Sequence, residues 1–354
     1  MKIFVINPGS TSTKLAIYED EKQVWAGGAH HSVNDLDKFH NPIEQFQYRL
    51  KLVYDILEKN NIPVKFDAII ARGGLLKPTP GGVYRIDDRI KYDLIHAKME
   101  HACNLGALIA DDMAGKCGCP SYIADPEVVD ELIEEARLTG IPEINRISIF
   151  HALNSKAVSR KYACTIEKKY EDINLIVVHL GGGISVSAHR KGKVIDVNNA
   201  LNGEGPFSPE RAGTIPADQF AELCFSGKYS LREVKKMLNG KGGLIAHLGS
   251  NDVATIAEKA EAGEEPFRKV LHAMIYTVAK QIGAMYVALS GKVDAIILTG
   301  GIAYCHYCVE LLKERIDYLA PIVVMPGEDE MGSLAYNAIN ALNGNFQLQT
   351  YNPE

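Results

Sequence analysis

The chain contains the same strand–turn–strand pattern twice, and this repeat limits the possible folds more than any other feature. Residues 3–6 are an apolar run, and a turn rich in Gly, Ser and Thr follows at residues 7–14 before a second apolar run. The pattern returns over residues 175–188, where Gly181 stands 172 positions after Gly9. Because this offset is close to half of the 354 residues, the repeat predicts two similar units, each with its own core.

A second pair of segments supports the duplication. Residues 67–75 and 294–302 both read Asp-Ala-Ile-Ile, two variable residues, Gly-Gly and one aliphatic residue. Such runs are typical of buried parallel strands that end in a glycine turn. Helical periodicity is present over residues 42–59, 126–138 and 267–289, and Asp125-Pro126 has the form of an N-cap followed by proline at the first helical position. The sequence therefore predicts a mixed α/β class.

Composition and charge argue against several classes of protein. Hydrophobic residues make up 46% of the chain and charged residues 23%, the balance of a globular enzyme. The net charge is −6 and there is no basic stripe, so nucleic acid is not an expected partner. No apolar run approaches the roughly 20 residues of a membrane span, and the short apolar start is a strand and no signal-peptide core. We therefore expect a cytoplasmic protein that does not bind membranes.

The seven cysteines do not form a disulfide framework, since their number is odd and the chain is long. Cys117-Gly118-Cys119 and Cys305-His306-Tyr307-Cys308 are two close pairs. Neither pair has a second pair of ligands at the spacing of zinc sites. Ordinary reduced thiols are expected.

The two glycine-rich turns are candidate phosphate-binding sites. Glycine lets backbone N–H groups approach phosphate oxygens closely, and Ser and Thr add hydroxyl donors. Two such turns that face each other across a cleft would hold the phosphate chain of a nucleotide. Neither turn has the P-loop pattern G-x-x-x-x-G-K-[ST], and neither opens a helix in the manner of dinucleotide-binding folds.

Three segments together, residues 7–14, 179–183 and 299–301, resemble the acetate and butyrate kinase family. The similarity runs from Lys2 to about Asn343. Further segments resemble the butyrate kinase branch in particular: residues 71–76, 124–131, 205–213 and 240–244. The family belongs to the sugar kinase, Hsp70 and actin superfamily. The resemblance therefore implies a duplicated actin-like (ribonuclease H-like) two-domain α/β fold with an ATP cleft between the lobes.

The resemblance also implies how the chain divides between the two lobes. We expect residues 1–150 together with 330–354 to form the N-terminal actin-like lobe. Residues 151–329 are expected to form the C-terminal lobe, which carries the adenosine site. A homodimer is expected from the family and from the apolar helix over residues 267–289.

Roles for single residues follow from the same resemblance, with ATP and Mg²⁺ as cofactors. A carboxylate nucleophile is already ionised at about pH 7, so the obstacle is its repulsion from the ATP phosphates. Arg72 and Arg211 are expected to neutralise that repulsion, and His179 to donate a hydrogen bond to the transferring phosphoryl group. Asp125 is expected to help to place Mg²⁺, with Glu328 as the second metal residue and Glu330 as the alternative. The implied cofactor-binding residues are Asn7, Gly9, Ser10, Ser12, Lys14, Gly181, Gly182, Gly183, Gly300, Gly301 and Ile302.

The expected reaction is the reversible transfer of the ATP γ-phosphoryl group to butanoate, which gives butanoyl phosphate and ADP. Acetate kinases have F-H-G-T-S-H near the middle of the chain, and here the segment keeps the first histidine as His151 and has Ser155 in place of the second. This departure favours the butyrate branch. Isobutyrate, propionate or acetate remain alternative acceptors. A sugar kinase with Asp125 as base and a nucleotide-binding chaperone are the alternatives from other classes.

Overall fold

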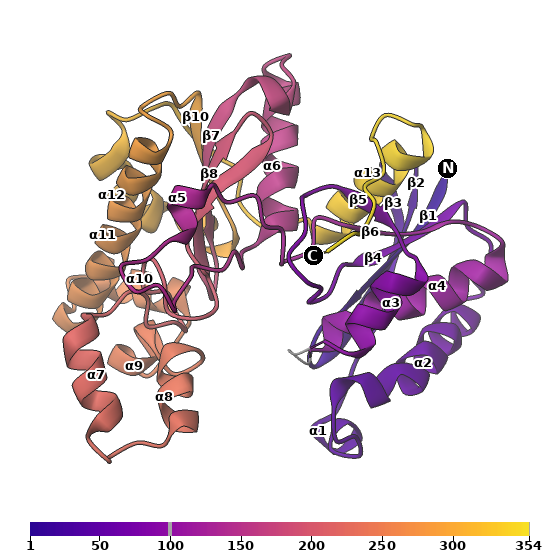
Figure 1. The fold of residues 1–354 in the computed structure, drawn as a ribbon, viewed down its shortest axis with the longest axis horizontal. Coiled ribbons are helices and arrows are strands. Elements are labelled where there is room, and N and C mark those ends of the chain that lie inside the picture. The colour runs from indigo at the N-terminus through magenta and orange to yellow at the C-terminus, as the bar shows by residue number, and fades with distance from the viewer. Residues whose placement is uncertain (98–100, 354) are drawn as a thin grey trace. The chain divides into compact units, whose positions relative to one another are not determined.

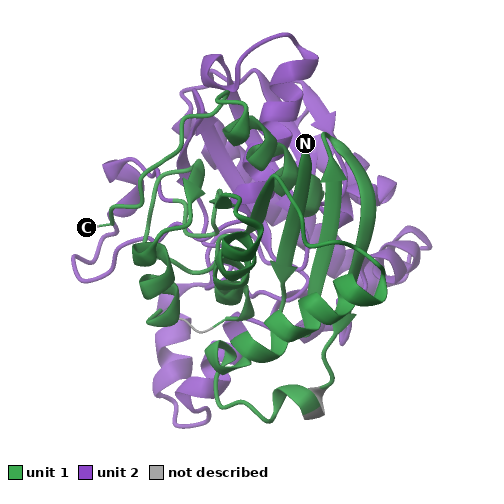
Figure 2. Cartoon of the chain, turned by 90° about the vertical axis from the view of Figure 1, so that its right-hand side faces the viewer, with its two compact units in different colours: residues 1–129, 329–354 green, residues 130–328 purple. Residues whose placement is uncertain are grey.

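Each half of the chain builds one β-sheet flanked by helices, in a computed structural model that describes residues 1–97 and 101–353 (Figure 1). The chain divides into two compact units, residues 1–129 with 329–354 and residues 130–328 (Figure 2). The C-terminal segment therefore returns to the unit that the N-terminus begins.

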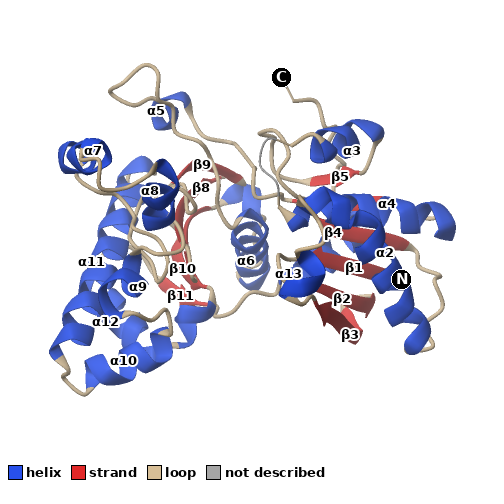
Figure 3. Cartoon of the chain, turned by 90° about the horizontal axis from the view of Figure 1, so that it is seen from below, coloured by secondary structure: helices blue, strands red, loops and turns tan. Residues whose placement is uncertain are grey.

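The first unit contains a six-stranded sheet in the order β3-β2-β1-β4-β6-β5. Its strands are β1 (Lys2–Pro8), β2 (Ser12–Glu19), β3 (Lys22–His30), β4 (Ala68–Arg72), β5 (Val83–Arg85) and β6 (Ser121–Ala124). Its α-helices are α1 (Val33–Leu36), α2 (Phe46–Lys59), α3 (Asp88–Ile95), α4 (Leu105–Cys117) and α13 (Glu330–Leu342), and short 3₁₀ helices cover Pro42–Gln45 and Ala102–Asn104. Helices α2 and α4 share a core with alternate residues of β1 such as Phe4 and Ile6, and α13 packs against β1 and β4 from the other face (Figure 3).

The second unit contains a five-stranded sheet in the order β11-β10-β7-β8-β9. Its strands are β7 (Asn174–Leu180), β8 (Ile184–Arg190), β9 (Lys193–Val197), β10 (Ala295–Thr299) and β11 (Ile322–Val324). Its α-helices are α5 (Glu134–Arg137), α6 (Ala152–Thr165), α7 (Ala217–Phe225), α8 (Leu231–Leu238), α9 (Gly243–Leu248), α10 (Val253–Glu261), α11 (Glu265–Ala288) and α12 (His306–Ile316), with 3₁₀ turns at Tyr170–Asp172 and Gly301–Tyr304. Helices α11 and α12 cover one face of this sheet and α6 covers the other (Figure 3).

The two sheets confirm the duplication that the sequence predicts. Strands β3-β2-β1-β4-β6 correspond to β9-β8-β7-β10-β11, with antiparallel pairing in the first two steps and parallel pairing in the last two of each set. Even an irregularity recurs, since the register shifts between Ile17 and Tyr18 in one sheet and between Ala188 and His189 in the other. The fold is therefore a duplicated, mixed α/β fold.

The helix predicted over residues 126–138 is wrong, and only Glu134–Arg137 within that range is helical. The cause lies at Asp125, which follows β6 with a φ of 38°. Its N–H donates to Gly82 O (2.9 Å) and its carboxylate accepts from Gly82 N (2.8 Å), so it does not cap a helix. Val129 instead forms an isolated parallel bridge with Thr79.

The boundary between the compact units also differs from the predicted one. It falls after Val129, whereas the sequence placed it after residue 150. Residues in between bond to the second unit's edge strand: Ile133 N donates to Ile195 O (3.1 Å), and Arg146 pairs with Asp196 (2.9 Å). These bonds explain why residues 130–150 join the second unit.

The long apolar helix predicted over residues 267–289 is present as α11. Its side chains Leu271, Met274, Val278 and Ile282 are all buried in the core of its own unit. The apolar face of α11 therefore gives no separate support to a dimer. None of the helices that the structure describes is long and apolar enough to cross a membrane.

Candidate active site

The turn between β1 and β2 is built around a buried arginine that the sequence did not single out. Arg49 on α2 has no exposed surface, and its guanidinium donates to the carbonyl oxygens of Gly9 (2.9 Å), Ser10 (3.1 Å) and Ser12 (3.2 Å). Its remaining bonds go to Thr13 Oγ1 and Gln45 Oε1. Because the carbonyls bond to Arg49, the turn is held in one conformation, and the side chains of Ser10 and Lys14 are exposed.

Arg72 lies at the end of β4 between two carboxylates. Its Nε donates to Glu127 Oε1 (2.5 Å), and its Nη1 lies 3.4 Å from Glu330 Oε1. Burial alone would lower the pKa of Arg72, but the charges of Glu127 and Glu330 raise it, so the guanidinium stays charged. Asn7 donates to the other oxygen of Glu330 (2.7 Å), which joins the β1–β2 turn to the arginine. Asn7, Arg72, Glu127 and Glu330 thus form one connected polar set.

Asp125 is buried, with 1% of its surface exposed, at the end of β6 beside the strand that carries Arg72. Its bond to Gly82 fixes one carboxylate oxygen. Within the described residues no three His, Cys, Asp or Glu side chains are grouped as a ready-made metal site. Mg²⁺ commonly uses only one or two protein carboxylates besides water and phosphate oxygens, so the donors at Asp125 and Glu330 still fit it by type.

His179 lies at the end of β7 in the second unit with 1% of its surface exposed. Its Nδ1 is 2.9 Å from Asn154 Oδ1, so this nitrogen carries the proton in the neutral ring. Its Nε2 lies 2.8 Å from Glu328 Oε1, but the two atoms are not aligned as a hydrogen bond and Nε2 has no partner of that kind. His151, whose Nδ1 contacts Ser185 Oγ, stacks on the His179 ring at 3.7 Å. Nε2 is therefore the ring nitrogen of His179 that has no hydrogen-bond partner, although Glu328 lies beside it.

The second glycine turn, Gly181 to Gly183, follows His179 and is tied to the segment that carries Arg211. Gly182 O accepts from Ser208 Oγ (2.6 Å) and from Glu210 N (3.2 Å). A Cβ at Gly181 would lie 3.1 Å from His179 Nε2, which explains glycine at this position. Arg211 contacts Glu210 Oε2 through Nη1 (3.0 Å), while its buried Nε has no partner.

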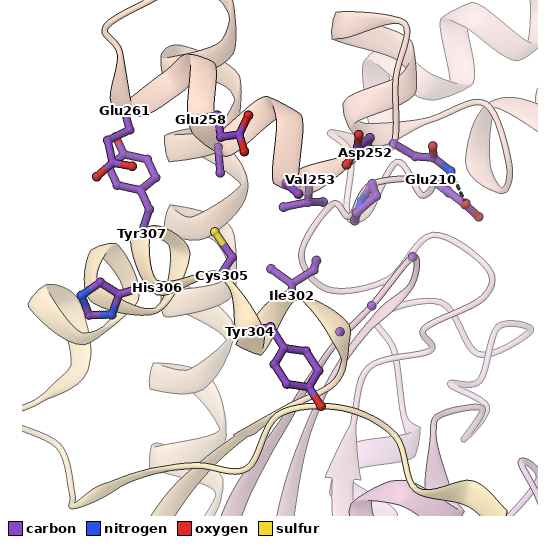
Figure 4. Close-up of a pocket in the computed structure, with 17 residues that line it drawn as sticks. Glu210, Asp252, Val253, Glu258, Glu261, Ile302, Tyr304, Cys305, His306 and Tyr307 are labelled. Carbon is purple, nitrogen blue, oxygen red and sulfur yellow. Dashed lines mark hydrogen bonds between the residues drawn. The ribbon is translucent and has the colours of Figure 1, made fainter.

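A cavity of about 640 Å³ opens beside this turn, within the second unit. Glu210 lies at one end, and Tyr307 and Glu261 lie at the other (Figure 4), while Gly181 and Gly182 also line the cavity. Its charged lining residues are all acidic: Glu210, Asp252, Glu258 and Glu261. Such a lining suits hydroxyl and amino donors of a ligand and disfavours its phosphates.

The predicted adenosine residues Gly301 and Ile302 line this cavity, and Gly300 directly precedes them in the chain. Gly300 has a φ of 86°, and a Cβ there would collide with the carbonyl of Leu180. Gly300 also exchanges two backbone hydrogen bonds with Gly327 (3.2 and 3.0 Å), which places Glu328 beside His179. Only glycine allows the two segments to approach this closely.

Comparisons with known proteins agree on one family. A model of the acetokinase family matches residues 143–320. A protein of Phocaeicola vulgatus named "Probable butyrate kinase" is 74% identical over all 354 residues and 100% of both chains, and "Butyrate kinase 2" of Clostridium acetobutylicum is 46% identical over 99% of both. The chain belongs to the acetokinase family. The crystal structure of acetate kinase from Porphyromonas gingivalis is similar with a TM-score of 0.79 over 96% of this chain and 99% of that one, and at 17% identity it shows the fold.

In this acetokinase the predicted residues form two sets, one in each unit. Asn7 and Arg72 share a network in the first, where Gly9 and Ser10 belong to the adjoining turn and Ser12 and Lys14 to the start of β2. The second holds His179, Gly181, Gly182, Gly183 and Arg211, together with Gly300, Gly301 and Ile302 around the cavity. Of the two alternative metal residues, Glu330 belongs to the first set and Glu328 to the second.

Several residues of both sets were not predicted. They are Arg49, Glu127, Asn154, Glu210 and the cavity residues Asn251 and Asp252. Glu127 stands within the segment 124–131 that already resembles the butyrate kinase branch, so that signal was available. No sequence signal marked Arg49, because an arginine on an amphipathic helix is normally exposed.

Proposed function

We propose that this acetokinase is a butyrate kinase, which transfers the ATP γ-phosphoryl group reversibly to the carboxylate of butanoate. The relatives named butyrate kinase, at 46% identity or more over almost the whole chain, support the substrate class. The observation that carries the chemistry is a pair of buried nitrogens, Arg211 Nε and His179 Nε2, that lack a hydrogen-bond partner. Buried polar groups are almost always hydrogen-bonded, so such a pair fits a phosphoryl group that binds during turnover.

The reaction needs charge neutralisation more than a base. A butanoate oxygen attacks the γ-phosphorus in line, the bond to the β–γ bridging oxygen breaks, and ADP leaves. Arg211 would donate to the equatorial oxygens of the transferring group, and His179 would donate from Nε2 when both of its ring nitrogens carry a proton. Arg72, whose charge Glu127 and Glu330 hold in place, would face the same group or the incoming carboxylate. We infer that both sets act on one phosphoryl group during turnover.

The cavity beside Gly181 is the proposed adenosine site. Glu210, Asp252 and Glu258 can accept hydrogen bonds from ribose hydroxyls and from the adenine amino group. Since all charged lining residues are acidic, the phosphates would extend past Gly181 and Gly182 toward His179 and Arg211. The turn from Gly9 to Lys14 and Asn7 would contact the phosphates from the first unit.

Mg²⁺ is the proposed metal, and it would neutralise charge on the β- and γ-phosphates. Asp125 and one glutamate near residue 329 are the expected metal residues. Glu330 is the better candidate of the two alternatives, because its carboxylate belongs to the set of Asn7 and Arg72, while Glu328 faces His179. The proposed location is the cytoplasm, where ATP is available.

A substrate panel tests the function. With MgATP, the purified protein should form an acyl phosphate that hydroxylamine traps, from butyrate and more weakly from acetate, propionate or isobutyrate. One methylene is worth about 1–3 kcal/mol in an apolar pocket, so the preference among acids is expected to be gradual. Glucose and glycerol serve as controls and should give no ADP. Phosphorylation of a sugar without any acyl phosphate would overturn the proposal.

A further inference from the structure

The Cys305-His306-Tyr307-Cys308 segment has no part in the proposed transfer, yet it lies at the nucleotide cavity. Cys305 precedes the first residue of α12, a helix of 11 residues, and is half-buried. Cys308 is in the first turn of that helix, with 1% of its surface exposed. Cys305 lines the cavity together with Ile302 and Glu258, and Figure 4 shows its sulfur directed to the side that carries Glu258.

The surroundings of the two thiols make them unequal. The neighbouring Cys308 thiol is the main cause that lowers the pKa of Cys305. Burial and the charge of Glu261 act in the opposite direction and raise the pKa of Cys305. The first-turn N–H groups of Tyr307 and Cys308 lower it, although they do not form capping hydrogen bonds to the Cys305 side chain. The Cys305 sulfur and burial raise the pKa of Cys308. Cys305 is thus the sulfur with thiolate character, and it is the one that reaches the cavity.

We propose that Cys305 is a modification site that reacts with disulfide reagents of low molecular weight in competition with the nucleotide, and that Cys308 resolves the adduct. The competition part rests on the proposed function, because it requires the cavity to bind ADP or ATP. The sequence alone predicts ordinary reduced thiols, whereas the proposal gives Cys305 and Cys308 different roles.

The two steps balance as thiol–disulfide exchange. The Cys305 thiolate attacks one sulfur of glutathione disulfide, a new S–S bond forms, and one glutathione leaves as a thiolate that takes up a proton. Cys308 then loses its proton to solvent and attacks the Cys305 sulfur, so the second glutathione leaves. Both cysteine thiols are oxidised, and one glutathione disulfide is reduced to two thiols. Cys308 follows the N-cap residue Cys305 by three positions, about one helical turn, as this ring closure requires.

Labelling of the native protein with iodoacetamide tests the first step, with peptide mass spectrometry as the readout for each cysteine. Cys164 is the control, because it is exposed and distant from the cavity lining. An ordinary thiol is only a few per cent thiolate at about pH 7, so Cys305 should react at least about tenfold faster than Cys164. Cys308→Ala should slow labelling of Cys305, and Glu261→Gln should accelerate it. Equal rates at Cys305 and Cys164 would overturn the proposal.

MgADP and glutathione disulfide test the remaining two parts. Saturating MgADP should slow labelling of Cys305 about tenfold and leave Cys164 unchanged. With glutathione disulfide, the wild type should end with a Cys305–Cys308 disulfide, and Cys308→Ala should stop at the glutathione adduct. An adduct that persists in the wild type would refute resolution by Cys308.

The kinase assay on the same samples separates this proposal from the proposed function. If butyrate is phosphorylated but MgADP does not protect Cys305, the competition is refuted while the function stands. If Cys305 reacts fast but neither protection nor turnover is seen, the proposed function fails and the reactive thiol remains.

Discussion

At the scale of single residues, Arg72 and Arg211 are held in different ways. Arg72 contacts two carboxylates, Glu127 and Glu330, so its charge is compensated before any substrate binds. Arg211 contacts the side chain of its neighbour Glu210 and keeps an unpaired Nε. A phosphoryl group would therefore add a missing partner at Arg211, whereas at Arg72 it would compete with existing ones.

Arg49 is proposed as a positioning residue, because it contacts the turn between β1 and β2, the proposed phosphate contact, and not the reacting atoms. Arg49→Met removes the donors for Gly9, Ser10 and Ser12, and each unsatisfied carbonyl costs about 1–3 kcal/mol. We expect a lower melting temperature and a KM for ATP raised about tenfold or more. Arg49→Lys keeps the charge without the fork and should rescue stability more than KM.

Exposed Lys51 on the same helix is the matched control for Arg49. Lys51→Met should change neither the melting temperature nor the KM for ATP. If Arg49→Met lowers stability but leaves the KM for ATP at the wild-type value in the folded fraction, Arg49 is structural only.

The two metal candidates can be separated by magnesium titration. Glu330→Gln should raise the Mg²⁺ concentration needed for half-maximal turnover, because it removes a charge next to Asn7 and Arg72. Glu328→Gln should leave that concentration nearly unchanged and act on kcat through His179. The opposite pattern would return Glu328 to the metal, as the sequence first suggested.

At the scale of elements, strands were easier to predict than helices. Runs such as 175–180 and 295–299 are continuous, apolar and buried, so their pattern is unambiguous. The helix over residues 126–138 failed because the Asp125 side chain bonds to Gly82, 43 positions away. Short-range N-cap rules cannot detect a competing partner from another strand.

The same limit applies to the candidate site. The two glycine turns were visible in the sequence itself, whereas Arg72 and His179 were predicted from the resemblance to the kinase family. The partners that orient them come from distant positions, as Glu127 does for Arg72 across 55 residues. Burial of a charged residue such as Arg49 depends on packing and leaves no local pattern.

His31 follows β3 and contacts Tyr48 of α2, and it predicts a dependence of stability on pH. Burial, with a smaller effect of Arg49, lowers the pKa of His31 from 6.5 to about 4. Below pH 6.5 the His31 imidazole binds a proton in the unfolded chain but not yet in the folded state. The free energy of unfolding should therefore fall as the pH drops from 6.5 toward about 4. His31→Gln should flatten this part of the curve in urea unfolding.

Exposed His40 provides the control for that curve. His40→Gln should leave the slope between pH 6.5 and about 4 as in the wild type. An unchanged slope in His31→Gln would show that other groups cause the acid sensitivity.

At the scale of the whole molecule, we propose a homodimer on the basis of the family, since α11 is covered within its own unit. Sedimentation at micromolar concentration should give about twice the chain mass of 38.8 kDa. A monomer under these conditions would contradict the dimer and leave the chemistry untouched.

The central claim is that residues of both units neutralise one transferring phosphoryl group. Steady-state turnover of Arg72→Ala, Arg211→Ala and the double variant with butyrate and MgATP tests it most directly. Each single change should lower kcat about 10²–10³-fold with little effect on ATP binding, and the double variant should lose much less than the product of the two. Ser155→Ala is the control and should be far milder. Near-normal turnover in both single variants would contradict the account.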